Sequence, residues 1–217
     1  AVNLGNMANI CRNMGDFEQT LELYETAVEI SRQVEDKRSE GRHLANMALI
    51  NMELKNPDKA LALFFQALQI NRHVEDRRAE AITLGNIGCL YAEIDKLPEA
   101  VDHLNQSIQY CDDCQFLVGS HVFRAELAKA LAKDERYDEA IAAFEGTSEL
   151  FKNTPVEYGK SLCTKAEVLH MSGQAKAAEI ILLEAKDIAT SLLPNKDMRL
   201  EETINRVEKM LRSVGEQ

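Results

Sequence analysis

The chain repeats one pattern at an interval of forty residues. The stretches LGNMANIC, LANMALIN and LGNIGCLY begin at Leu4, Leu44 and Leu84. Small residues recur at the same interval in three sets: Ala8, Ala48, Gly88 and Ala128; Thr20, Ala60, Ala100 and Ala140; and Ala27, Ala67, Ser107 and Thr147. A fixed period of this length indicates stacked copies of one supersecondary unit, each of which contacts mainly its neighbours.

Each copy has the spacing of two helices. Leu84, Ile87, Gly88 and Tyr91 lie at i, i+3, i+4 and i+7, which is the spacing of one helix face. Helix-breaking residues separate the two runs of a copy, at 14–16, 55–57, 95–96 and 172–173. The sequence therefore predicts five helical hairpins, at about 1–40, 41–80, 81–120, 121–158 and 159–190. Residues 192–217 carry one apolar stripe with polar residues around it, which predicts a C-terminal capping helix and a tail.

Composition and charge exclude several other classes of protein. The 217 residues carry a net charge of −11, which would repel a nucleic-acid backbone unless basic residues were concentrated in one patch. Only 4 Pro and 10 Gly are present, too few for the many turns of a sheet protein. No apolar run approaches the ~18 residues of a membrane span, and the first residues do not resemble a signal peptide. Because the chain does not begin with Met, we expect a processed protein or a piece of a longer one.

The polar residues do not form a recognisable catalytic or metal site. Phosphate-binding, metalloprotease and nucleophile-elbow motifs are missing, and the 5 histidines fall at different phases of the repeat. Five cysteines without a secretion signal predict reduced thiols in a cytoplasm. Cys111 and Cys114 form a CxxC, but Asp112 and Asp113 between them disfavour a reactive thiolate. We therefore expect a non-enzymatic protein without cofactor or metal, in which these cysteines are structural.

The repeats resemble the tetratricopeptide repeat family, whose usual repeat has about 34 residues. The resemblance covers nearly all of residues 1–190, through Leu/Gly/Tyr positions in the first helix and Ala/Phe/Ala positions in the second. The longer period and the linkers VEDKRSE (34–40) and VEDRRAE (74–80) resemble a subclass that includes kinesin light chains, Partner-of-Inscuteable adaptors and C-terminal arrays of bacterial signalling proteins. The resemblance implies an all-α fold, a right-handed α-solenoid that binds protein segments in its concave groove. The fourth repeat departs from the pattern at Arg124 and Glu126.

A row of polar residues on the first helices is the candidate binding site. At 100° per residue, positions 2, 6, 9 and 13 lie opposite the packing stripe, and the resemblance implies that this row faces the groove. The predicted peptide-binding residues are Asn6, Asn9, Asn13, Arg42, Asn46, Glu53, Asn86, Glu93, Lys129, Lys133 and Lys160. An Asn carboxamide can both donate to and accept from an extended backbone, so Asn6, Asn46 and Asn86 would hold a peptide of almost any sequence. The alternative is that these three side chains bridge neighbouring helices of the solenoid.

Further expectations concern the partners. Lys129, Lys133 and Lys160 would favour acidic residues of a peptide, unless they form an ordinary solvated face. The first copy lacks an N-terminal counterpart of the capping helix, so Leu4 and Met7 should leave an apolar patch that promotes self-association or docking of an upstream segment. The expected function is a protein–protein interaction scaffold that binds an extended peptide. The alternative is a sensor or oligomerisation array of a larger bacterial kinase or nucleotide cyclase.

Overall fold

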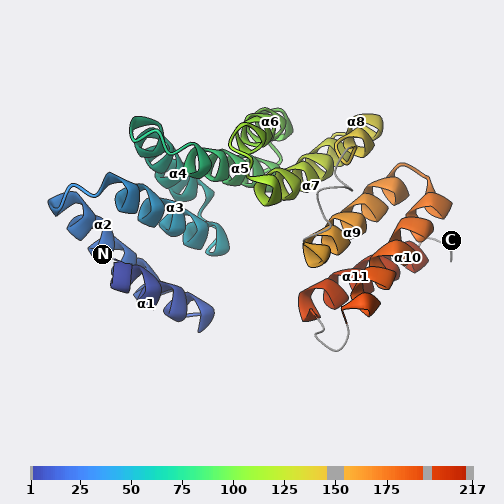
Figure 1. Ribbon diagram of the computed structural model, residues 1–217, viewed down its shortest axis with the longest axis horizontal. Coiled ribbons are helices and arrows are strands. Elements are labelled where there is room, and N and C mark those ends of the chain that lie inside the picture. Colours follow the sequence, from blue (N-terminus) through green and yellow to red (C-terminus); the bar gives the residue numbers. More distant parts are fainter. Residues whose placement is uncertain (1, 146–153, 193–196, 214–217) are drawn as a thin grey trace. The chain divides into compact units, whose positions relative to one another are not determined.

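The computed structural model describes residues 2–145, 154–192 and 197–213, and every regular element within these ranges is an α-helix (Figure 1). The first six are α1 (Val2–Asn13), α2 (Phe17–Gln33), α3 (Lys37–Glu53), α4 (Pro57–His73), α5 (Arg77–Glu93) and α6 (Leu97–Asp113). The others are α7 (Leu117–Lys133), α8 (Tyr137–Ala142), α9 (Pro155–Met171), α10 (Ala175–Ser191) and α11 (Met198–Ser213). The predicted all-α class is confirmed.

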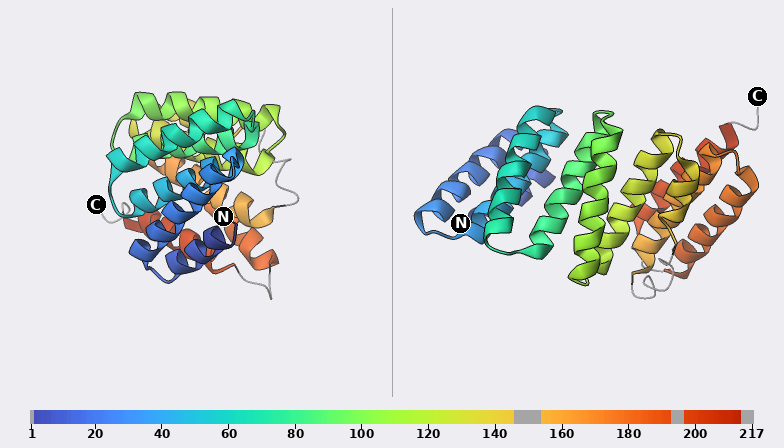
Figure 2. Two further views of the ribbon diagram at one scale, coloured as in Figure 1. Left: turned by 90° about the vertical axis from the view of Figure 1, so that its left-hand side faces the viewer. Right: turned by 90° about the horizontal axis from the view of Figure 1, so that it is seen from above.

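The chain divides into two compact units, Ala1–Cys114 and Gln115–Gln217. Within the first unit, each helix from α1 to α5 packs against the helix that follows it along the chain (Figure 2). In the second unit α9 contacts α7, α8, α10 and α11. The stacking of helical hairpins that the repeats predict is therefore confirmed within each unit.

Helices of seventeen residues and connections of three residues account for the forty-residue period. Each helix from α2 to α7 has 17 residues, and the three residues after it lead into the next helix. The middle connecting residue is left-handed, with φ between 55° and 58° at Glu35, Lys55, Glu75, Asp95, Gln115 and Glu135. The following amide then bonds back to the last turn, as Asp36 N does to Ser31 O at 2.9 Å. Because turns within and between hairpins share this geometry, one hairpin occupies forty residues.

A buried glutamate ties each of the first two hairpins to the next. The Glu40 side chain, in the first turn of α3, is 5% exposed and accepts hydrogen bonds from Arg32 Nε at 2.7 Å and Lys37 Nζ at 2.8 Å. The arrangement recurs forty residues later with Glu80, Arg72 and Arg77. Two cationic side chains thus pair with the buried carboxylate at each joint, the contact between one hairpin and the next. These ion pairs offset the desolvation cost of burying the charge.

The linkers expected over 34–40 and 74–80 are shorter than predicted. The Asp36 side chain accepts a hydrogen bond from the Ser39 amide at 3.0 Å, and Asp76 does the same for Ala79. These two caps satisfy the first amides of α3 and α5, so the helices already begin at Lys37 and Arg77.

Large and small side chains alternate in the core of the first unit. Tyr24, Phe64 and Leu104 occupy the same register of α2, α4 and α6, and all three are buried. Gly88 on α5 allows α6 to come close, because a Cβ at this position would lie 2.6 Å from Leu104 Cγ. The recurring small residues therefore mark the places where helices cross at short distance.

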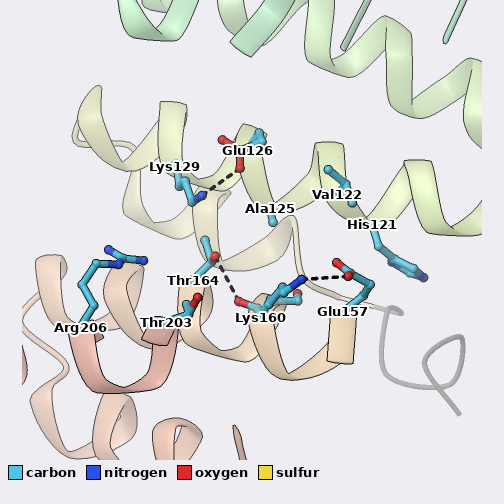
Figure 3. Close-up of a pocket in the computed structure, with 11 residues that line it drawn as sticks. His121, Val122, Ala125, Glu126, Lys129, Glu157, Lys160, Thr164, Thr203 and Arg206 are labelled. Atoms are coloured by element: carbon cyan, nitrogen blue, oxygen red, sulfur yellow. Dashed lines mark hydrogen bonds and ion pairs between the residues drawn. The ribbon is translucent and has the colours of Figure 1, made fainter. Parts of the chain in front are cut away.

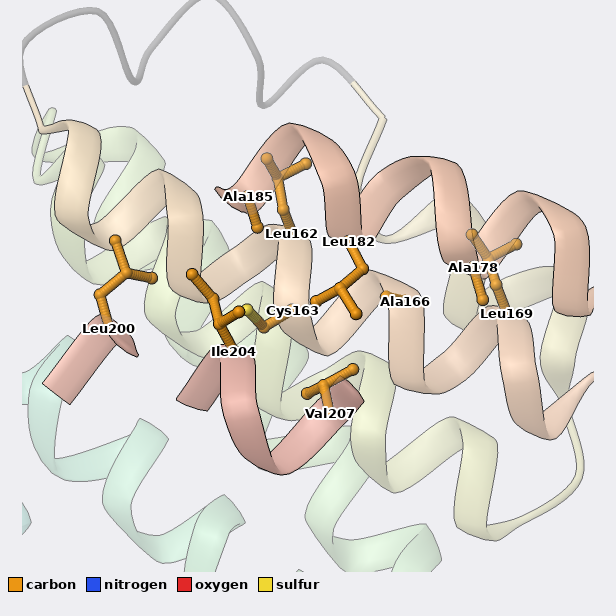
Figure 4. Close-up of a cluster of buried hydrophobic side chains, with 10 residues drawn as sticks. All are labelled: Leu162, Cys163, Ala166, Leu169, Ala178, Leu182, Ala185, Leu200, Ile204 and Val207. Atoms are coloured by element: carbon orange, nitrogen blue, oxygen red, sulfur yellow. The ribbon is translucent and has the colours of Figure 1, made fainter. Parts of the chain in front are cut away.

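The last helix, α11, covers the apolar side of the α9–α10 hairpin. Leu200, Ile204 and Val207 are buried in a cluster that includes Cys163 and Leu182 (Figure 4). Apart from Met198 at its start, the exposed residues described for the same helix are polar, among them Glu202, Asn205, Arg206, Lys209 and Arg212. The capping helix expected from this apolar stripe is confirmed.

The division into five repeats stays a prediction. Helix α8, the second helix of the predicted fourth repeat, is described only for Tyr137–Ala142. Thr147, the last small residue of its set, lies outside the described residues.

Candidate functional site

In the first unit, the predicted row lies on the accessible face of α1, α3 and α5. Asn6, Asn9 and Asn13 are exposed, and Asn46 and Asn86 are half-buried. Their neighbours on the packing side of α3 and α5, such as Leu44, Ala48, Leu84 and Gly88, are buried in the helix stack. The row therefore has the accessibility that a ligand needs.

A cavity of about 580 Å³ within the first unit is lined by side chains of α3, α4 and α5. Asn46 on α3 and Asn86 on α5 both line it, and Leu49 and Ile82 supply apolar lining. In the lining of the same cavity, the Asn71 carboxamide donates a hydrogen bond to Thr83 Oγ1 at 3.0 Å. Amide groups and an apolar surface thus meet in one depression, a combination that suits a peptide with one apolar side chain.

Arginines surround this cavity. Arg38, Arg42 and Arg78 line it, against one carboxylate, Asp76, whose side chain already caps α5. Arg38 and Arg78 lie forty residues apart in the two VED stretches, and this recurrence was a sequence signal for both residues, although neither belongs to the predicted polar row. The cavity therefore has a positive surround in an acidic protein.

A smaller cavity of about 170 Å³ lies between α1 and α3. It is lined by Asn6, Asn9, Arg42, Asn46 and by the ring of His43. Burial, followed by the nearby Arg42 charge, lowers the pKa of His43, so this histidine is neutral at physiological pH. Four residues of the predicted row therefore meet at this cavity.

The asparagines differ in how far the fold already uses them. Asn9 Oδ1 accepts a hydrogen bond from the Tyr24 hydroxyl at 2.6 Å. Burial raises the pKa of Tyr24, while a hydrogen bond with Asn46 acts against that rise. Within the described residues, the carboxamides of Asn6 and Asn86 form no hydrogen bond. Asn9 thus joins α1 to α2, although the helix-bridging alternative named Asn6, Asn46 and Asn86, and of these three only Asn46 has such a contact within the described residues.

Three residues of the row lie at helix ends, outside these cavities. Glu53 forms an ion pair with Arg12, in which Arg12 Nε is 3.0 Å from Glu53 Oε1. Glu93 Oε2 is 4.0 Å from Lys55 Nζ. Asn13 is exposed at the end of α1. The ion pairs join the ends of neighbouring hairpins, which is a structural role for Glu53 and Glu93.

The second unit has its own cavity, of about 270 Å³, lined by α7, α9 and α11 (Figure 3). Lys129, Lys160 and Arg206 contribute one cation from each helix. Each cation has a carboxylate beside it, in the pairs Lys129–Glu126 at 2.8 Å, Lys160–Glu157 at 3.0 Å and Arg206–Glu167 at 2.6 Å. Lys133 is exposed and does not line the cavity.

Arg206 is a residue of this cavity that the sequence alone did not identify. The apolar stripe of α11 places it only on the polar side of the capping helix, and the packing of α11 on α9 decides which polar residues reach the cavity. The hydroxyls of Thr164 and Thr203 lie beside it in the lining. An acidic group entering here would meet three cations but would have to compete with three carboxylates.

The CxxC has no features of a redox or metal site. Burial raises the pKa of the Cys111 thiol to about 11, so the thiol is protonated at neutral pH. The Cys114 thiol donates to the Cys111 carbonyl at 3.6 Å. In the described part of the chain no group of His, Cys, Asp and Glu side chains is arranged to hold a metal ion. Nor is any described helix both long and apolar enough to cross a bilayer.

Comparison with family models decides the classification. Two models described as tetratricopeptide repeat match residues 4–38 and 39–113. The chain belongs to the tetratricopeptide repeat family. The tetratricopeptide hairpins correspond to α1–α2, α3–α4 and α5–α6, which carry the polar row of the first unit. No curated protein sequence matches the chain.

Several solved structures share the fold at low sequence identity. BtubC (BKLC) from P. vanneervenii is 15% identical with a TM-score of 0.77, and the match covers 89% of this chain and 81% of that one. A STAND protein with a tetratricopeptide repeat sensor from Pyrococcus horikoshii is 16% identical with a TM-score of 0.72, over 97% of this chain and 36% of that one. YrrB, described as a TPR protein with an unusual peptide-binding site, is 16% identical with a TM-score of 0.54, over 96% and 92%.

Proposed function

We propose that the chain is a non-enzymatic scaffold that binds an extended segment of a partner protein on the accessible face of α1, α3 and α5. One observation carries this proposal. Asn46 and Asn86 line the same cavity from successive first helices, and Asn86 forms no hydrogen bond within the described residues. Each bond from such a carboxamide to a peptide backbone contributes on the order of 1 kcal/mol, so affinity is spread over several residues.

The cavity chemistry indicates which peptides bind best. Leu49 and Ile82 favour an apolar side chain, and the surrounding arginines Arg38, Arg42 and Arg78 favour acidic residues beside it. In the second unit, Lys129 and Lys160 favour acidic residues too, weakly, because each already neighbours a glutamate. The partner is thus a protein segment that is acidic and contains a buried apolar anchor. The YrrB description supports peptide binding as a use of this fold, and five cysteines without a disulfide among them support a cytoplasmic setting.

The test is to pan a peptide library against the chain and to measure the captured peptides against variants. Asn46→Ala and Asn86→Ala should each weaken binding about five-fold. Asn105→Ala, on the exposed surface of α6, is the matched control and should change nothing. Failure to capture any peptide, or a lower melting temperature with every affinity intact, would exclude the asparagine row as a binding site.

A second candidate function rests on a different observation, the exposure of apolar side chains on α1. Met7 and Ile10 on α1 and Met14 directly after it are 51%, 59% and 79% exposed, which favours association through the first repeat, including self-association. Such a surface suits a sensor or oligomerisation array in a larger signalling protein, and the similarity to the STAND sensor supports this use. Light scattering over a range of concentrations, with Met7→Glu as the variant, tests it: a mass that rises with concentration in the wild type alone supports self-association.

A further inference from the structure

Two arginines that line the cavity of about 580 Å³ in the first unit are not balanced by carboxylates. Within the described residues Arg38 and Arg42 on α3 form no ion pair, and their guanidinium groups make one hydrogen bond, from Arg42 Nη2 to Ser39 Oγ at 3.3 Å. The two arginines stand at i and i+4 of one helix, a spacing at which like charges destabilise the helix. An anionic ligand in the cavity would offset this repulsion.

The neighbouring cations of the same joints are paired. Glu40 binds one cation from α2 and one from α3, and Glu80 binds two more, forty residues later. Arg38 and Arg42 belong to the same part of the chain, yet they line the cavity and do not take part in these pairs. The contrast indicates that the charge of these two arginines serves the cavity and not the joint.

The charge of the lining indicates the charge of the ligand. A third arginine, Arg78, lines the cavity from α5. Among the described lining residues, three positive charges thus stand against one negative charge, that of Asp76, whose side chain already caps α5. One carboxylate of a ligand would neutralise only half of the remaining charge. A phosphomonoester carries about −1.5 to −2 at pH 7 and neutralises nearly all of it.

The type of cation also suits a phosphate. A guanidinium group presents its N–H groups in a planar fork that binds two oxygens of one phosphate, and a phosphate has three such oxygens. All three cations of this lining are arginines. In the cavity of the second unit, by contrast, Lys129 and Lys160 each neighbour a glutamate. The first cavity therefore has the number and the kind of cations that a phosphomonoester needs.

We propose that this cavity binds a phosphoserine or phosphothreonine of the partner segment, and that Arg38 and Arg42 hold its phosphate. This inference rests on the proposed peptide-binding function and names a modification of the bound segment. Leu49 and Ile82 take an apolar side chain next to the phosphorylated residue, and Asn86 binds the backbone of the same segment. Phosphorylation of the partner thus strengthens its binding to the scaffold.

The experiment pans two peptide libraries against the full chain, one with phosphoserine and one with glutamate at a fixed position. Captured sequences are synthesised in both forms, and their affinities are measured by fluorescence anisotropy. The phosphoserine form should bind at least about ten-fold more tightly than the glutamate form. This advantage should shrink as the pH falls below about 6, where the phosphate takes up a proton. Both forms meet the same ionisable side chains, Asp76 and the neighbouring His43 among them, so the ratio of the two affinities reports chiefly the phosphate.

Variants of the chain locate the phosphate. Arg38→Gln and Arg42→Gln should each remove most of the advantage of phosphoserine over glutamate. Lys59→Gln is the matched control, because Lys59 is exposed on α4, outside the lining of the cavity, and its loss changes the charge of the same unit equally. This control should keep the advantage in full. Inorganic phosphate, at concentrations at which the phosphopeptide binds, should not displace it.

The possible failures are distinguishable. Capture from the glutamate library with equal affinity of the two forms would overturn this inference and leave the peptide-binding function in place. An equal loss of advantage in Lys59→Gln, or displacement by inorganic phosphate at concentrations at which the phosphopeptide binds, would overturn the inference as well. No capture from either library would overturn both proposals.

Discussion

Replacing Glu40 by Gln removes the charge of a buried carboxylate and keeps its volume. One oxygen of Glu40 is 2.7 Å from Arg32 Nε and the other is 2.8 Å from Lys37 Nζ, so each accepts from a different cation. The carboxylate is 5% exposed, whereas the two cations are 53% and 48% exposed and can return to water in the variant. The change therefore breaks the joint between α2 and α3 without leaving a buried cation behind.

The size of the effect follows from these contacts. A hydrogen bond to a charged group contributes about 1.5–3 kcal/mol, and partial exposure of the cations places both bonds near the lower end. Two bonds then contribute about 3 kcal/mol. Gln keeps one acceptor and avoids the desolvation of a charge, so the expected loss in unfolding free energy is about 2 kcal/mol.

This loss should depend on pH. Burial raises the pKa of the Glu40 carboxyl, but the hydrogen bonds from Arg32 and Lys37 outweigh it and hold the pKa below its ordinary value of 4.5. Ionised Glu40 thus stabilises the fold above that ordinary value, and the contribution is lost as the pH falls through the lowered pKa of the folded state. The difference between wild type and variant should accordingly shrink in acid.

The assay is urea unfolding followed by far-ultraviolet circular dichroism, at neutral pH and at decreasing pH values where the chain stays helical. Hydrogen exchange of the first turn of α3 locates the effect. Glu99→Gln, exposed in the first turn of α6, is the control and should change stability by less than about 0.5 kcal/mol. A loss for Glu40→Gln as small as that of the control, or one that is constant across pH, would refute the reasoning.

Three other changes have definite expected outcomes. Gly88→Ala should lower the unfolding free energy by about 2 kcal/mol, measured in urea, because the new methyl group overlaps Leu104 Cγ at 2.6 Å. Iodoacetamide followed by mass spectrometry should label the exposed Cys114 well before Cys111, whose buried thiol has a pKa of about 11. Because burial lowers the pKa of His43, the stability contributed by the neutral ring is present above its ordinary value of 6.5 and lost as the pH falls below it. His43→Phe should flatten that loss in a melting-temperature series.

The hairpin fold could be predicted because its signals are local. Apolar spacing at Leu84, Ile87 and Gly88 defines a helix face, and the forty-residue recurrence indicates that the faces stack. The length of the connections could not be predicted in the same way. Glu35 and Glu75 adopt a left-handed conformation that sequence rules assign to glycine, so the start of α3 and α5 was hidden in apparently polar linkers.

The buried glutamates show a second limit of the sequence pattern. Glu40 and Glu80 look like solvated linker residues, although the recurrence of VED, a basic pair and Glu forty residues apart was the signal for a shared structural role. At the corresponding positions 112–120 the chain reads DDCQFLVGS, without this set of charges, and the division between the two units falls there, after Cys114.

The candidate site was predictable only as a face of the helices. Helical periodicity is enough to place Asn46 and Asn86 on the accessible side. It does not predict the hydrogen bond from the Tyr24 hydroxyl to Asn9, since this contact depends on how α2 packs on α1. Nor does it predict that Arg206 lines the same cavity as Lys129 and Lys160, because this depends on how α11 packs on α9. Contacts between helices far apart in the sequence are not encoded in the period of one helix.

The central proposal is that Asn86 holds the backbone of a bound peptide, and a double-mutant cycle measures this most directly. Library-derived peptides are made with an ester in place of single backbone amides, which removes one N–H donor with little change in shape. Their affinities for wild type and Asn86→Ala are compared by calorimetry. At the peptide position whose N–H group bonds to Asn86, the ester should weaken binding to the wild type about five-fold. The same ester should have no further effect on binding to the Asn86→Ala variant. Ester and Ala effects that simply add at every position would contradict the proposal.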